Sequence, residues 1–131
     1  MQAPHQTIKT AGEKEKFLVE LFDTLYSRYR KRMEYVRKYE QVVKAHGAVF
    51  FNDHIAFRTI AGQNPHAGIF MISRIFEALG YHSANCYEFP DKHFSSIHYQ
   101  HPNRQLPKLF ITQLKGWELS LPSQKIIRQL L

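Results

Sequence analysis

A chain of 131 residues with 44% hydrophobic residues is long enough to bury one domain-sized core, and it is too apolar for a disordered chain. The formal net charge is +7, from 18 Lys and Arg and 11 Asp and Glu. This charge permits anionic partners but does not identify one. The single cysteine, Cys86, excludes a disulfide framework within one chain and favours a reducing compartment.

Membrane insertion and secretion are not indicated by the sequence. It has no apolar run of the roughly 20 residues that a membrane-spanning helix needs. Its N-terminal residues also lack the apolar core of a signal peptide. We therefore expect a cytoplasmic protein without a membrane partner.

The first third of the chain is predicted to be helical. Residues 1–12 are polar, and we expect a flexible N-terminus there. Residues 13–47 carry apolar side chains at three- and four-residue steps, which predicts one long helix or two helices with a break near residues 30–34. Such a stripe is typical of a surface that faces a core.

Positive charge is concentrated in the same helical segment, at Arg28, Arg30, Lys31, Arg32, Arg37, Lys38 and Lys44. Glu34 and Glu40 interrupt it, and Glu34 can pair with Lys38 four residues later. The simpler interpretation is a solvated helix face. The alternative hypothesis is a non-enzymatic binding module that uses residues 28–44 to contact nucleic acid or an acidic partner.

Residues 48–115 have the pattern of a β-α-β-β-β module. A strand near residues 53–60 precedes a short amphipathic helix that Gly80 is expected to end. Three strand-like segments follow at residues 81–89, 94–100 and 108–114, separated by turn-forming residues. Residues 116–131 are expected to form a connector and the start of a further helix, capped by Ser123. The predicted fold class is therefore α+β, with a helical segment followed by one module that has a mixed, curled sheet.

The strand DHIAFRTI, residues 53–60, carries the candidate site. Because side chains alternate along a strand, His54, Ala56, Arg58 and Ile60 are predicted to share one face. Imidazole is a common metal ligand, and guanidinium grips carboxylates with two parallel hydrogen bonds. His54 and Arg58 would thus suit a metal and an acidic substrate, and the alternative is a strand with a solvated polar face.

Three stretches, in one unbroken order, resemble the N-terminal half of the 2-oxoadipate dioxygenase/decarboxylase family. They are DHIAFRT (53–59), LGY (79–81) with YEFPDK (87–92), and LPKLFITQL (106–114), and the resemblance covers roughly residues 15–131. It implies a vicinal-oxygen-chelate fold, in which β-α-β-β-β modules pair around a metal. The order of elements predicted from the residues alone matches one such module.

The resemblance also implies a chemistry and two site residues. His54 matches a ligand of non-haem iron(II), and Arg58 matches the arginine that binds a substrate carboxylate. Members use O2 to convert 2-oxoadipate to 2-hydroxyglutarate and CO2 in lysine degradation. The family's second histidine and its ligating carboxylate belong to a second module that is missing here. We therefore expect a truncated product, a split subunit or half of a homodimer, inactive as a single chain.

Other candidates are weaker. Gln113 lies on the last strand of the module, but a glutamine carbonyl is a poor substitute for a ligating carboxylate, so it is not assigned. The His98 side chain can lie on the same face of the sheet as His54. His98 and His101 are three residues apart, so on one strand their side chains would point to opposite faces. Cys86 is expected to be a buried thiol. Surface positions are expected for His5, His46, His66, His82 and His93.

Overall fold

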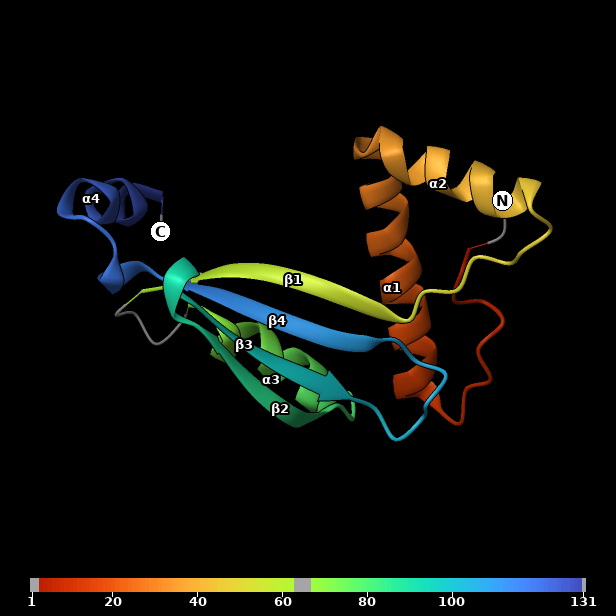
Figure 1. Cartoon of the computed structure of the whole chain (residues 1–131). Helices are drawn as coiled ribbons and strands as arrows, with labels where there is room; N and C mark the ends of the chain where they lie inside the picture. Colours follow the sequence, from red (N-terminus) through yellow and green to blue (C-terminus); the bar gives the residue numbers. More distant parts are fainter. Residues whose placement is uncertain (1–2, 63–66, 131) are drawn as a thin grey trace. The chain divides into compact units, whose positions relative to one another are not determined.

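The computed structural model describes residues 3–62 and 67–130 (Figure 1). Its elements are α1 (Glu13–Arg32), α2 (Glu34–Ala45), β1 (His54–Ala61), α3 (Ile69–Ala78), β2 (His82–Phe89), η1 (Pro90–Lys92), β3 (Phe94–Gln100), β4 (Lys108–Lys115), η2 (Gly116–Glu118) and α4 (Leu121–Leu130). Within the described residues the chain forms two compact units. The first runs to Asp53 and includes Asn103–Leu106, and the second takes His54–Pro102 and the residues from Pro107 onward.

The first unit is built on α1 and α2. The chain breaks between them at Met33, whose extended backbone (φ −112°, ψ 103°) leaves the helical region, so two helices form rather than one. Leu18 and Phe22 are fully buried on the inner side of α1. Both belong to the periodic apolar stripe, so this part of the stripe faces a core, whereas its members Phe17, Tyr29 and Met33 are exposed.

His5 is a buried part of this unit, and its expected surface position is wrong. The residue is only 1% exposed. Its Nδ1 donates to Asp23 Oδ1 at 2.7 Å, and the Asn52 amide donates to its Nε2 at 2.9 Å. Burial lowers the pKa of His5, and the bond to Asp23 opposes that shift. These contacts tie residue 5 to α1 and to the segment before β1.

The basic segment is partly engaged within its own unit. Arg30 Nε donates to both carboxylate oxygens of Glu40, at 3.0 and 2.8 Å, and the Tyr26 hydroxyl donates to the same carboxylate. Arg37 donates to backbone carbonyls at the end of α1. Lys38 pairs with Glu34 at 3.0 Å, as the four-residue spacing predicts. Arg30 and Arg37 therefore join α1 to α2, whereas Lys38 pairs within α2.

The second unit is the predicted β-α-β-β-β module. Its sheet has the order β1-β4-β3-β2, with β1 and β4 parallel and the other neighbours antiparallel. Gly80 has φ 104° and ends the turn after α3, as expected. Helix α4 begins at Leu121, two residues before the predicted cap Ser123. The reason is that Ser120 accepts the first helical bond, from the Gln124 amide.

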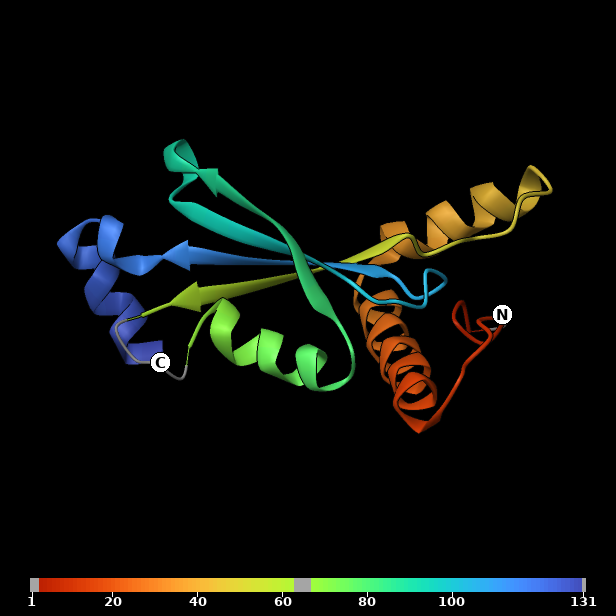
Figure 2. The same cartoon turned by 90° about the horizontal axis from the view of Figure 1, so that it is seen from below.

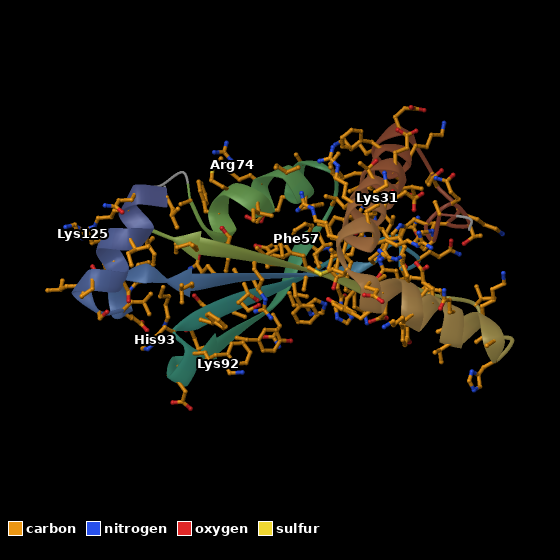
Figure 3. All side chains as sticks on the ribbon, turned by 90° about the horizontal axis from the view of Figure 1, so that it is seen from above. Lys31, Phe57, Arg74, Lys92, His93 and Lys125 are labelled. Carbon is orange, nitrogen blue, oxygen red and sulfur yellow. The ribbon has the colours of Figure 1, made fainter. Side chains whose placement is uncertain are left out.

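Helix α3 covers one face of this sheet (Figures 1 and 2). Phe57 of β1, labelled in Figure 3, packs on Phe76 of α3 with ring centroids 5.3 Å apart. We call this side the α3 face, and the side that carries the alternate residues of β1 the His54 face. Among the described residues, no helix is long and apolar enough to cross a membrane.

Candidate functional site

His54 and Arg58 occupy the His54 face of β1, as the alternation predicts. Exposure alternates along the strand, with His54, Ala56 and Arg58 exposed and the residues between them half-buried. Alternate residues point to the same side of a strand, so both side chains emerge on the side opposite Phe57. Four strand steps of ~3.3 Å put their Cα atoms roughly 13 Å apart. Ala56 lies between them and contributes only a methyl group.

Arg58 lies above an aromatic ring. Its guanidinium carbon is 5.7 Å from the ring centroid of Phe94, a cation–π distance. In the register of the sheet, Arg58 is level with Thr112 on β4 and Ser96 on β3. These two hydroxyls are buried and bonded to each other at 2.9 Å. The guanidinium therefore stands at the exposed end of a polar row with an apolar ring beside it.

Phe110 connects His54 to His98 on the same face. Its ring meets the His54 imidazole edge to face, with centroids 5.8 Å apart. On the other side it stacks on the His98 imidazole, with centroids 4.7 Å apart and planes 3° apart. His98 thus shares the His54 face, but Phe110 stands between the two imidazoles. Sequence reasoning missed Phe110 because its place beside both histidines follows from strand pairing, and no local pattern signals it.

Gln113 faces the other way. Its Oε1 accepts a bond from the Ile69 amide at the start of α3, at 3.0 Å, and its Nε2 donates to Ser95 at 3.2 Å. In the register it is level with Thr59, one step off the row of Arg58. It therefore lies on the α3 face and does not approach His54.

The side chains on the His54 face can supply one ligand of a metal site but not a complete set of ligands. Within residues 3–62 and 67–130, no group of three or more His, Cys, Asp or Glu side chains gathers as a metal site would require. His54 offers a single imidazole, and stable transition-metal sites in proteins need three or four ligands. The described residues alone therefore do not complete an iron site.

The remaining candidates have other environments. Cys86 is exposed, contrary to the expected buried thiol, because β2 is an edge strand with little covering it. His101 lies beyond the end of β3, where it is buried and donates to the Leu79 carbonyl at 3.2 Å. His93 pairs with Glu118 at 2.9 Å. His46 and His82 are exposed, as expected, and His66 lies outside the described residues.

The family assignment comes from a match along most of the chain. Residues 16–131 match the model of a family described as 2-oxoadipate dioxygenase/decarboxylase. The chain belongs to this family. The matched span includes β1 with His54 and Arg58, and all of the sheet that carries them. No curated protein matches the sequence.

Three solved structures share the fold of this family member. A protein of Shewanella frigidimarina NCIMB 400, whose given name suggests a hydrolase, is 33% identical with a TM-score of 0.75 over 86% of this chain. Hydroxyglutarate synthase of Oryza sativa, solved in complex with 2-oxoadipate, is 24% identical with a TM-score of 0.82 over 98%. A protein of Ralstonia eutropha JMP134, whose name suggests the glyoxalase superfamily, is 19% identical with a TM-score of 0.78 over 92%.

These likenesses confirm the vicinal-oxygen-chelate fold of the family. The chain spans 43% of the Shewanella protein, 45% of the Oryza enzyme and 40% of the Ralstonia protein. It thus corresponds to less than half of each of these larger chains.

Proposed function

We propose that this chain forms part of a non-haem iron(II) dioxygenase/decarboxylase that acts on 2-oxoadipate. One observation carries the proposal: His54 and Arg58 stand exposed on the same face of β1, with only Ala56 between them. Family membership and the 2-oxoadipate complex of the Oryza enzyme support it. The reaction would consume 2-oxoadipate and O2 and release 2-hydroxyglutarate and CO2, which balances without a further co-reactant.

In this proposal His54 supplies one iron ligand. A second module would supply the other ligands, from the same polypeptide, from another chain or from a second copy of this one. The bound iron would supply the chemistry of O2 and of the 2-oxo acid. The role of His54 is to present one imidazole on a rigid strand, which leaves other positions of the metal for substrate.

Arg58 would bind the carboxylate at the far end of the substrate. Its planar guanidinium matches a carboxylate with two parallel hydrogen bonds. A six-carbon dicarboxylate held by its 2-oxo acid end near His54 would lie over Ala56, whose methyl group leaves room for the methylene chain. Phe94 beside the guanidinium excludes water from one side of the ion pair and so strengthens it.

The experiment measures bound iron, oligomeric mass and O2 uptake with 2-oxoadipate on the same purified protein. In a dimeric form, or in a form reconstituted with a second module, His54→Ala is expected to abolish stoichiometric iron binding. The matched control is His46→Ala, which removes an exposed imidazole just after the end of α2 and should leave iron binding unchanged. Equal iron content in the wild type and in His54→Ala would remove the metal assignment.

A further inference from the structure

The contact between Phe110 and His54 restrains the imidazole at the centre of the candidate site. The two rings meet at an interplanar angle of 77°, an edge-to-face arrangement that aromatic pairs favour. Phe110 is level with Ala56 in the register of β1 and β4, and from there it is placed to restrain the direction of the His54 side chain.

Phe110 is itself held from the opposite side. The His98 ring lies parallel to the Phe110 ring, with centroids 4.7 Å apart, and the centroid of the Tyr87 ring is 6.1 Å from that of Phe110. The three rings come from three neighbouring strands, β4, β3 and β2. A phenylalanine packed against rings on β3 and β2 cannot move away from β1 without disturbing both.

His98 acts in this stack as a flat, uncharged ring. Burial lowers the pKa of His98, with a smaller contribution from Lys108, so the imidazole stays neutral near pH 7. Its Nε2 is buried and has no hydrogen-bond partner among the described residues. The ring stack on Phe110 is therefore the contact through which His98 affects the site.

We propose that Phe110, backed by His98, is a positioning residue that holds the His54 imidazole in one rotamer and so prepares it for its ligand. That this restraint serves metal binding rests on the proposed function, but the restraint itself is a property of the metal-free protein. A pre-set ligand loses less conformational freedom on binding a metal, as other groups that orient metal ligands show.

The first test reads the His54 rotamer directly, without metal. Three-bond N–Cγ and C′–Cγ couplings of His54 in the isotope-labelled protein are expected to report one staggered χ1 state. In Phe110→Leu the His54 side chain should exchange between rotamers, so that the couplings take averaged values. His98→Ala should average them partly, whereas His98→Phe should keep the wild-type values because it preserves the stack. Phe94→Leu, on the same face beside Arg58, is the control and should leave them unchanged.

Single-rotamer couplings in both Phe110→Leu and His98→Ala would overturn the proposal, as would equal averaging in Phe94→Leu. Backbone amide spectra of α3 show whether each variant is folded. If Phe110→Leu does not fold, the His98→Ala and His98→Phe pair decides, because both retain Phe110.

The second test measures divalent metal affinity on the complete metal-binding assembly. Phe110→Leu should weaken it by about 10-fold or more, the range seen when residues that orient a ligand are removed. Affinity for adipate, which lacks the 2-oxo group and depends on Arg58, should not change. Loss of metal in His54→Ala without any effect of Phe110→Leu would overturn this inference alone. Retention of metal in His54→Ala would instead overturn the proposed function.

Discussion

Gln113 and Ile69 join the last strand of the module to its helix. The side-chain oxygen of Gln113 accepts a 3.0 Å bond from the Ile69 amide, one of the donors that a helix start leaves without a helical partner. Gln113 is thereby committed to the α3 face of the sheet. Its position on the strand made it a conceivable ligand, but its direction gives it a structural role.

Removing the Gln113 amide should cost stability and leave the site intact. Gln113→Leu leaves the Ile69 amide without its acceptor, so we expect a loss of about 1 to 3 kcal/mol in the free energy of unfolding. Gln113→Glu keeps an acceptor oxygen and should lose less. Urea unfolding measures both, and equal stability of Gln113→Leu and the wild type would contradict this role.

A side chain at Gly68 should be poorly tolerated. The residue has φ 78° and ψ −158°, a region that essentially only glycine occupies, and an added Cβ would lie 2.5 Å from Gln113 Oε1. Gly68→Ala should therefore lower the free energy of unfolding by about 1 to 3 kcal/mol, the usual cost of such backbone strain. Gly12→Ala, where a Cβ meets nothing within 4 Å, is the control.

Arg58→Lys should weaken substrate binding although it keeps the positive charge. A lysine cannot form the two parallel bonds of a guanidinium with a carboxylate, so we expect a loss of about 1 to 3 kcal/mol in 2-oxoadipate binding. Calorimetry on the metal-loaded assembly measures it. Arg74→Lys on α3 is the control, because Arg74 is an exposed arginine that points away from the sheet (Figure 3). Similar losses in both variants would argue against a carboxylate site at Arg58.

Stability should fall as the pH drops from 7 to 5. Burial holds the pKa of His5 below its ordinary value of 6.5, and the pKa of His98 is lowered too. In this window the unfolded chain binds protons that the folded chain does not, so the free energy of unfolding decreases toward lower pH. Asp and Glu ordinarily titrate below this range.

His5→Gln tests the share of His5 in that pH dependence. Glutamine carries no titrating proton. Denaturant unfolding at several pH values should therefore show a free energy of unfolding that depends less steeply on pH than in the wild type. Asp23 is the charged group that faces the imidazole, and its carboxylate bond to Nδ1 works against the lowering. An unchanged slope in His5→Gln would show that His5 does not cause the pH dependence.

Arg30 should matter for folding more than its neighbours in the basic segment. Arg30 donates to Glu40, which is 5% exposed. Removing the Arg30 side chain would leave this buried carboxylate with fewer hydrogen-bond partners. We expect Arg30→Ala to lower the free energy of unfolding by about 1 to 3 kcal/mol, and Arg28→Ala, at an exposed position, to change it little. If residues 28–44 bound nucleic acid instead, both variants would weaken binding that falls steeply with added salt.

Much of the fold could be predicted because it follows from local periodicity. The apolar stripe of α1 and the alternation in β1 reflect the 3.6- and 2-residue repeats of helix and strand. Gly80 ends α3 because its positive φ suits glycine. The buried state of His5 and the exposure of Cys86 were not predictable in this way, since both depend on which distant segment covers the residue.

The sequence by itself determined that His54 and Arg58 share a face, because the alternation of a strand is a local property of its backbone. It also determined the family, through motifs spread along the chain. Only the tertiary structure decided that Phe110 stands between His54 and His98, and that Gln113 faces α3. Those relationships arise from the pairing register of β1, β4 and β3. It places each residue of β1 beside a residue of β4 that lies 54 positions later in the chain, and it leaves no mark within any one segment.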